Sequence, residues 1–259
     1  MKVVVFGGGG GVTKEFTRLA SPLNEVIVVT QDERYQSDIR ALGGSPRVLD
    51  TEYAAQPEVT AFLEFNKPDA VIWAVSPGGG SGGAGNELLP PAATATKTFE
   101  AIEQAGLRRV LLISTIDARN TSKPHPRHYN EVSRWTSDGI WKLIPGYMAA
   151  KMETEQALHR SGLDFTLLRP GVLVDTPARG VELGLVQIAK NGYRNGALDV
   201  TALIGNMKTC SRALVGEVLL ACLQDAGTIG LTLGVMDGDK DVFDEVQRCA
   251  RDGVDAWEE

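Results

Sequence analysis

The chain has 259 residues, of which 43% are hydrophobic and 23% are charged, with a formal net charge of −7 and a pI near 5.1. This length and this apolar fraction are typical of one large globular domain and exclude a disordered chain. The acidic balance excludes a basic surface for phosphate backbones, so we expect neither a nucleic acid nor an anionic membrane as a partner.

Strands and helices alternate along the chain from its first residues. Continuous apolar runs predict strands, and apolar residues three to four positions apart predict helices. The predicted strands are 1–6, 26–30, 46–50, 69–75, 108–115, 165–170 and 231–236, and the predicted helices are 12–23, 33–43, 57–66, about 88–105, 147–161 and 211–224. Because both faces of such strands are apolar, we expect an α/β fold with a parallel sheet covered by helices on both faces.

Neither an internal repeat nor a linker divides the chain, so we expect a single domain over residues 1–259. Residues 171–210, rich in Gly and Asn, suggest a small substrate-side insertion that closes over a cleft. Two loops, 77–85 and 117–146, follow predicted strands, and ligands of open α/β sheets bind at the carboxyl ends of strands. A flexible linker is the alternative for 77–85.

The cysteine and histidine residues predict no metal site. Cys210, Cys222 and Cys249 are widely spaced and form no CxxC pair, which is typical of idle thiols in a reducing compartment. His125 and His128 stand on a proline-broken loop, where we expect solvated side chains. No apolar run approaches the roughly 20 residues that span a bilayer, and VVVF is too short for the core of a signal peptide. We therefore expect a cytoplasmic location.

A run of five glycines, Gly7 to Gly11, separates the first strand from the first helix. Glycine is needed there because a side chain would block the approach of backbone amides to a pyrophosphate, which the helix N-terminus also attracts. A generic tight turn is the alternative. In the Rossmann spacing Gly7 and Gly10 match, and the third glycine is replaced by Thr13, which predicts a displaced helix or a hydroxyl on phosphate.

The end of the second strand bears on the choice between NADP and NAD. NAD sites carry an acidic residue about 20 positions after the loop, and this chain has Thr30 there. Lys14 and Arg34, close by in the sequence, favour a 2′-phosphate and hence NADP. Asp32 keeps NAD as the alternative cofactor.

Tyr147 and Lys151 are four positions apart on a predicted helix and therefore share one face. A phenol with a pKa near 10 exchanges protons poorly at neutral pH unless a neighbouring cation favours its phenolate. Lys151 and the helix N-terminus supply such positive potential. A chance polar stripe on an ordinary helix is the alternative.

Several motifs together resemble the NmrA-like group of atypical short-chain dehydrogenases/reductases over most of the chain. The matching stretches are FGGGGGVT (6–13), VLD (48–50), VIWAV (71–75), RRVLLIST (108–115), YMAAKMETEQALHRSGLDFTLLRPGVLVD (147–175) and TCSRALVGEVLLACL (209–223). The resemblance implies a Rossmann-like doubly wound sheet of about seven strands, ordered 3-2-1-4-5-6-7, with a small C-terminal substrate-side lobe.

The resemblance also implies roles for individual residues. Tyr147 would exchange a proton with a substrate oxygen, and Lys151 would tune it and hold the nicotinamide ribose. Asp50 would accept a hydrogen bond from the adenine amino group. The residues implied at the pyrophosphate are Gly7, Gly10, Gly11 and Val12, and those implied along the ribose and nicotinamide are Ala74, Val75 and Ser76.

The group's third catalytic partner is a serine or threonine at the end of the fifth strand. Ser114 and Thr115 lie there, although strand capping is an alternative for both, and the position that matches the catalytic serine holds Ile116. This departure keeps a second function open, because some NmrA-like proteins bind NADP as a sensor and turn nothing over.

The sequence thus predicts an NADP-dependent oxidoreductase that acts on a small carbonyl, alcohol or enone. A non-catalytic redox sensor, or an epimerase or dehydratase that uses bound cofactor, is the alternative. Trp135, Trp141, Tyr129 and Met148 would form a wall for an aromatic substrate or would pack the loop onto the core. No pattern in the chain indicates an oligomeric state.

Overall fold

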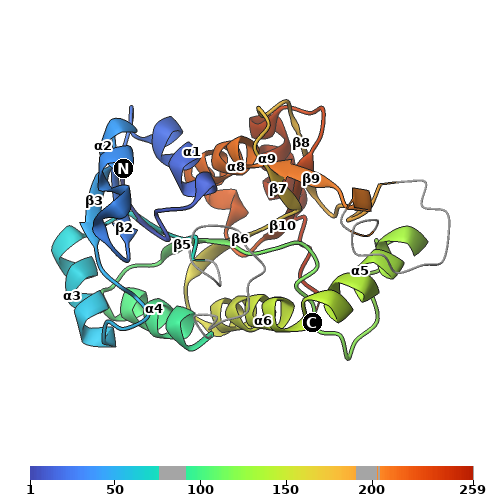
Figure 1. Cartoon of the computed structure of the whole chain (residues 1–259), viewed down its shortest axis with the longest axis horizontal. Helices are drawn as coiled ribbons and strands as arrows, with labels where there is room; N and C mark the ends of the chain where they lie inside the picture. Colours follow the sequence, from blue (N-terminus) through green and yellow to red (C-terminus); the bar gives the residue numbers. More distant parts are fainter. Residues whose placement is uncertain (76–91, 191–202, 204, 259) are drawn as a thin grey trace.

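The computed structural model describes residues 1–75, 92–190, 203 and 205–258, and it has a mixed sheet between two layers of helices (Figure 1). Eight strands follow the order β3-β2-β1-β4-β5-β6-β10-β8. They are β1 (Lys2–Phe6), β2 (Glu25–Thr30), β3 (Ser45–Val48), β4 (Ala70–Trp73), β5 (Arg109–Ile113), β6 (Asp164–Pro170), β10 (Thr232–Asp237) and β8 (Val181–Gly184). All neighbouring pairs are parallel except β10 and β8.

This topology confirms the predicted Rossmann-like fold. With β10 as the seventh predicted strand, the first seven strands have the expected 3-2-1-4-5-6-7 order. The antiparallel strand β8 was not predicted, because VELG is short and is not a continuous apolar run. It extends the sheet by one strand at the edge beyond β10.

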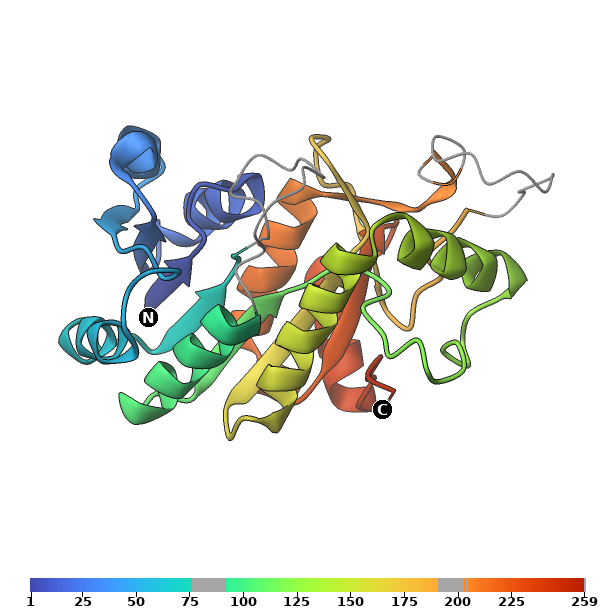
Figure 2. The same ribbon diagram turned by 60° about the horizontal axis from the view of Figure 1, so that its bottom comes forward.

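The helices divide between the two faces of the sheet. Their bounds are α1 (Gly11–Ala20), α2 (Gln36–Ala41), α3 (Gln56–Asn66), α4 (Ala92–Gln104), α5 (Glu131–Leu143), α6 (Pro145–Arg160), α8 (Arg212–Gln224) and α9 (Val242–Asp252). One face carries α1, α8 and α9, and the other carries α3, α4 and α6, which come forward in Figure 2. Alternate residues of each strand therefore enter two separate apolar cores, as the two-faced apolar strands predicted.

The segment 117–146, predicted as a loop, contains a helix. Asn130 begins α5 as its N-cap, where its side chain accepts a hydrogen bond from the Ser133 amide at 2.8 Å. Pro145 then starts α6, since proline fits the first helical turn but not a helix interior. The prediction that the whole segment is irregular was wrong, because α5 presents its apolar side to a small third core rather than to the main sheet.

The segment 171–210 contributes to two sheets. Strand β8 completes the edge of the main sheet, while β7 (Val172–Val174) and β9 (Thr209–Ser211) pair in parallel as a small sheet of their own. The single-domain assignment, with 171–210 as an insertion, stays a prediction. Among the residues that the structure describes, no helix has both the length and the apolar character to cross a bilayer.

Candidate functional site

The glycine loop packs closely against the carboxyl ends of β1, β2 and β4. Gly7 has a positive φ of 90°, and a Cβ there would lie 2.6 Å from the Ala74 carbonyl carbon, just after β4. A Cβ on Gly8 would lie 2.2 Å from Val28 of β2, and one on Gly9 would lie 2.6 Å from the Tyr35 ring. Side chains are therefore excluded, and the backbone is left as the surface of the loop.

Thr13, which replaces the third glycine, forms a hydrogen bond within the loop. Its buried hydroxyl donates to the Gly7 carbonyl oxygen at 3.1 Å, which ties the first turn of α1 to the strand end. The N-cap residue Gly10 supplies no side-chain acceptor, and the first turn of α1 has no acidic residue. The amides of Gly11 and Val12 thus begin a helix whose positive end has no side-chain cap, the feature that anion sites use.

Two predicted cations meet beside this loop at the tip of β2. Lys14 Nζ and the Arg34 guanidinium lie 5.6 and 5.7 Å from the centre of the Tyr35 ring. Each cation also contacts a carboxylate at 2.7 Å, Lys14 that of Asp38 and Arg34 that of Asp32. The hydrogen bonds from Arg34 hold the pKa of Asp32 below its usual value.

The other predicted cofactor residues surround the same edge. The Thr30 hydroxyl is turned inward and donates to the Asp32 carbonyl oxygen at 2.7 Å. The Asp50 carboxylate accepts a hydrogen bond from the Glu52 amide at 3.0 Å, which fixes the turn after β3. Ala74 and Val75 are half-buried after β4, whereas Ser76 lies outside the described residues.

Tyr147 and Lys151 lie together near the start of α6. Lys151 Nζ is 6.0 Å from the centre of the Tyr147 ring and donates to the carbonyl oxygen of Ile113, the last residue of β5, at 3.4 Å. The lysine side chain is almost fully buried, and this burial lowers its pKa to about 8, against an opposing effect of Glu155. The amine is still mostly protonated at neutral pH, so a cation stands beside the tyrosine.

The structure separates the two candidates for the third partner. The amides of Ser114 and Ile116 bond to carbonyl oxygens of Leu168 and Pro170, so strand geometry continues past β5. Strand alternation then places Ser114 on the face of α6 and Thr115 on the opposite face. The Ser114 side chain is buried next to the Glu155 carboxyl, without the geometry of an ordinary hydrogen bond. Burial raises the pKa of Glu155, and Arg169 and, to a smaller extent, the Ser114 hydroxyl oppose this rise.

A buried ion pair behind Lys151 was not predicted. Glu155, one helical turn after Lys151, is fully buried and contacts Arg169 of β6 through both carboxylate oxygens, with Nε at 3.2 and 3.1 Å. Arg169 also donates to the carbonyl oxygens of Ala118 and Ala256 at 2.7 and 3.0 Å. Arg169 therefore orders the end of β6. The only signal of this pair in the sequence was the i, i+4 spacing of Glu155 and Lys151 on one helix face.

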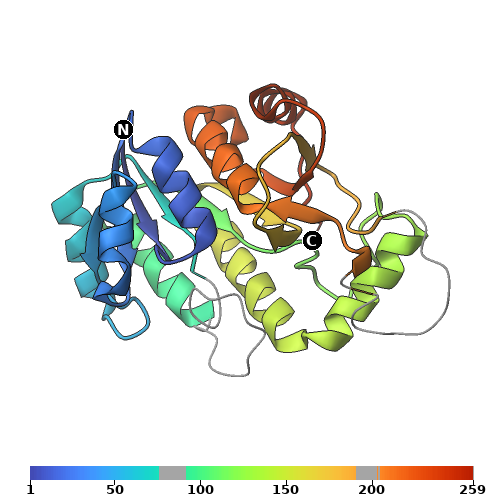
Figure 3. The ribbon, with the colours of Figure 1, turned by 45° about the horizontal axis from the view of Figure 1, so that its top comes forward.

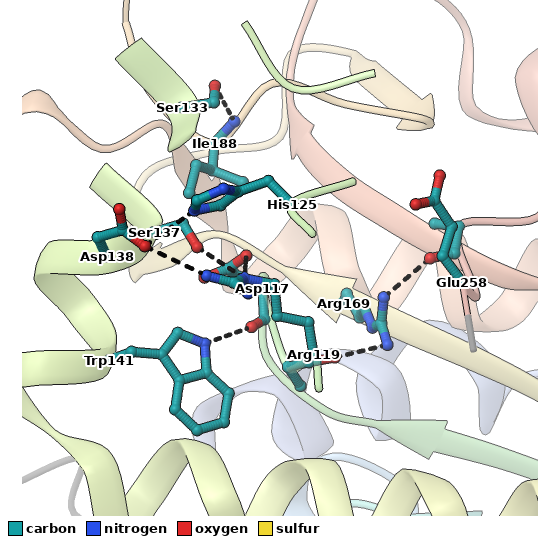
Figure 4. Close-up of polar contacts among 12 residues, drawn as sticks. Asp117, Arg119, His125, Ser133, Ser137, Asp138, Trp141, Arg169, Ile188 and Glu258 are labelled. Carbon is teal, nitrogen blue, oxygen red and sulfur yellow. Dashed lines mark hydrogen bonds and ion pairs between the residues drawn. The ribbon is translucent and has the colours of Figure 1, made fainter. Parts of the chain in front are cut away.

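Asp117 is a second unpredicted feature, in the loop after β5 (Figure 4). Its φ is 64°, its side chain is buried, and burial raises its pKa to about 6. The Arg119 guanidinium lies 3.4 Å away, and Trp141 of α5 donates to the Asp117 carbonyl oxygen at 3.1 Å. Ser137, also from α5, accepts from Arg119 at 2.9 Å. This polar cluster attaches α5 to the loop.

The side chains that were predicted to form an aromatic wall are partly buried in the third core and partly half-buried against it. Tyr129 and Met148 are buried in the third core, so they pack the loop rather than line an open wall. Trp135 and Trp141 are half-buried against the same core, as is Tyr147.

The two loop histidines are not both solvated. His125 contacts the Asp138 carboxylate at 2.8 Å, and His128 is half-buried with its ring edge-on to Tyr129. Burial lowers the pKa of His128. Within the described ranges, no group of three His, Cys, Asp or Glu side chains is placed to hold a metal ion.

Comparison with known proteins identifies the family. The model of the NAD(P)H-binding family matches residues 7–226, from the glycine loop to just past the end of α8. The chain belongs to this NAD(P)H-binding family. This membership confirms the NmrA-like resemblance, and the glycine loop with its uncapped helix start fits the pyrophosphate of such a cofactor.

A curated relative, a UPF0659 protein of Schizosaccharomyces pombe, is 34% identical over 189 residues, which cover 71% of this chain and 76% of the relative. The structure is similar to that of a putative NAD-dependent epimerase/dehydratase from Bacillus halodurans, with a TM-score of 0.70 and 22% identity over 96% of this chain and 99% of the other. It is also similar to a short-chain dehydrogenase/reductase from Veillonella parvula in complex with NADP, with a TM-score of 0.62 and 15% identity over 93% and 99% of the two chains. At these identities the two solved structures support the fold alone.

Proposed function

We propose that this family member is an NADP-dependent oxidoreductase that acts on a small carbonyl, alcohol or enone. The bound nicotinamide would give hydride to, or take it from, the substrate carbon. The Tyr147 hydroxyl would give a proton to, or take it from, the substrate oxygen in the same step, with Lys151 favouring the phenolate and holding the ribose. Ser114 or Thr115 would orient the substrate.

One observation carries this proposal, namely the burial of Lys151 beside Tyr147 at the end of β5. A buried ammonium group costs stability, and an apolar residue would pack this position more favourably. Strongly perturbed ionisable groups at the carboxyl edge of a parallel sheet mark functional sites more often than structural ones.

The choice of NADP rests on Lys14 and Arg34, which lie 5.6 and 5.7 Å from the centre of the Tyr35 ring, next to the glycine loop. Lys14 and Arg34 form ion pairs with Asp38 and Asp32, and both pairs are exposed to solvent. Exposed ion pairs contribute little free energy, so a 2′-phosphate would displace these carboxylates at low cost. The solved relative from Veillonella parvula that contains NADP agrees with this choice. The three buried free cysteines agree with a cytoplasmic location.

The test begins with fluorescence titrations of NADPH and NADH, followed by a screen of quinones, aldehydes and aromatic ketones for NADPH consumption. We expect tighter binding of NADPH and, for a turned-over substrate, a loss of at least about 100-fold in kcat in Tyr147→Phe, the range of general acid–base catalysis. Tyr53→Phe is the matched control, because Tyr53 is 82% exposed. Cofactor binding without turnover of any substrate, unchanged in Tyr147→Phe, contradicts the oxidoreductase.

That outcome favours the sensor, which Ile116 at the position of the group's catalytic serine supports, because an isoleucine side chain forms no hydrogen bond with a substrate oxygen. An epimerase or dehydratase, like the putative NAD-dependent enzyme of Bacillus halodurans, is the other alternative. It predicts conversion of the substrate into an isomer or a dehydrated product with no net consumption of NADPH.

A further inference from the structure

The helices α1 (blue) and α8 (orange) lie side by side in Figure 3. A Cβ on Gly11, at the start of α1, would lie 2.5 Å from Arg212 Cδ, at the start of α8. A Cβ on Gly216 would lie 3.0 Å from the Phe16 amide nitrogen, about one turn further along both helices. The second contact lies later than the first along both helices, so the two helices are parallel. Their positive ends therefore both lie next to the glycine loop.

The Arg212 side chain lies directly against the first residue of α1. Its Nε is 3.1 Å from the Cβ position of Gly11, so the absence of a side chain at Gly11 makes room for the stem of this arginine. The side chain of Arg212 is 26% exposed. It is therefore neither a core residue nor a freely solvated one, and its guanidinium stands at the rim of the loop.

The charge around Arg212 favours an anion. Neither α1 nor α8 has an acidic residue in its first turn. Among the described residues, one hydrogen bond is recorded for the guanidinium, from Nη1 to the carboxylate of Asp175 at 2.9 Å. A guanidinium has five N–H donors in a planar fork that matches phosphate oxygens, so most of its donors have no recorded protein acceptor.

We propose that Arg212 binds the pyrophosphate of the dinucleotide from the side of α8, opposite the amides of α1. Asp175, whose side chain is 86% exposed, holds the guanidinium in place and competes with the pyrophosphate for it. This inference rests on the proposed function, and it adds a residue about 200 positions from the glycine loop to the cofactor site.

The test uses Arg212→Gln and titrations with NADPH, NADH and adenosine 2′-monophosphate. NADPH and NADH share the pyrophosphate, so both should bind about 10- to 100-fold more weakly, the range of a hydrogen bond to a charged group. Adenosine 2′-monophosphate has no pyrophosphate and should bind unchanged. Arg34→Gln should show the opposite selectivity, with weaker binding of NADPH and of the monophosphate and little effect on NADH.

Two further variants keep the result interpretable. Arg179→Gln removes an exposed arginine four positions after Asp175 and should leave all three affinities unchanged. Asp175→Asn removes the competing carboxylate and should tighten NADPH and NADH by about 2- to 5-fold, because exposed ion pairs are weak. Unchanged or weaker binding in Asp175→Asn contradicts the competition between Asp175 and the pyrophosphate.

Equal affinity of Arg212→Gln and the unaltered protein for both dinucleotides overturns the role of Arg212 and leaves the oxidoreductase standing. Failure of the unaltered protein to bind either dinucleotide overturns the proposed function itself. If Arg212→Gln melts well below the unaltered protein, the arginine stabilises the α1–α8 contact. Arg212→Lys then distinguishes this structural role from binding of the pyrophosphate. Lysine keeps the stem and the charge, so recovery of the melting temperature without recovery of dinucleotide affinity supports the guanidinium contact, and recovery of both contradicts it.

Discussion

Replacing Glu155 by glutamine should destabilise the protein far more than the loss of one surface charge would. The carboxylate is fully buried and is hydrogen-bonded to Arg169, itself 7% exposed. Glutamine keeps the shape and one acceptor oxygen, but it leaves the guanidinium without its counter-charge inside the protein. Breaking one partner of a buried ion pair costs about 3–5 kcal/mol, a large part of a typical folding free energy of about 5–15 kcal/mol.

Urea denaturation followed by tryptophan fluorescence measures this loss as a change in the free energy of unfolding. Glu153→Gln is the matched control, because Glu153 is two positions away on the exposed side of α6. Its effect should stay within about 0.5 kcal/mol. A loss below about 1 kcal/mol in Glu155→Gln would refute the reasoning, because the pair would then be accessible to water.

A double variant checks the cause of the loss. Glu155→Leu combined with Arg169→Met removes both charges of the pair, so most of the lost stability should return. The carbonyl oxygens of Ala118 and Ala256 lose a donor in this variant, which leaves a residual deficit. The buried Lys151 loses the favourable charge of Glu155 in this variant, which adds to the residual deficit. A double variant as unstable as Glu155→Gln would show that shape, and not charge, holds this site together.

Three further predictions follow from burial and backbone geometry. Burial lowers the pKa of Lys151 to about 8, so Lys151→Met should stabilise the protein at pH 7 by up to about 3 kcal/mol while abolishing activity. Between about pH 8 and 10.5 the unfolded lysine holds its proton and the folded one does not, so the stability gained by Lys151→Met should shrink as the pH rises. Urea denaturation at pH 7 and near pH 10 measures this change. Burial raises the pKa of Asp117 to about 6, so Asp117→Asn, which tolerates the positive φ, should add about 2–3 kcal/mol at pH 8. That gain should fall as the pH drops below 6, where the folded carboxyl takes up its proton, and a constant gain would contradict the assignment. Gly7→Ala should cost at least about 2 kcal/mol and weaken NADPH binding, whereas Gly106→Ala, also at positive φ but with no atom within 4 Å of its Cβ, should cost less in thermal denaturation.

The sheet could be predicted because most of its strands are continuous apolar runs in the sequence. VVVF, VIVV and VLLI are continuous apolar runs, and the order of parallel strands then follows from the family resemblance. Helix α5 could not be separated from its polar, proline-containing loop, because it buries a narrow apolar side against a small core that no local pattern reveals. Strand β8 is defined by its pairing with β10, a partner about 50 residues away.

The candidate site shows the same division. Gly7, Tyr147 and Lys151 were predictable because short-range spacing carries their chemistry. The contact of Arg212 with Gly11 depends on the packing of two helices, and the burial of Asp117 depends on a loop conformation with φ of 64°. Neither feature leaves a periodic signal in the sequence.

The position of β10 in the sheet has a consequence for how the chain folds during synthesis. This strand lies between β6 and β8, yet it is the last of the eight described strands of this sheet to be made. Until residues 232–237 leave the ribosome, β6 has an unpaired edge and β8 has no partner in the sheet. An unpaired edge is a template for pairing with another chain, and such long-range pairing is slow to form. The nascent protein should therefore depend on chaperones late in translation, when all but the final strand and helix are already present.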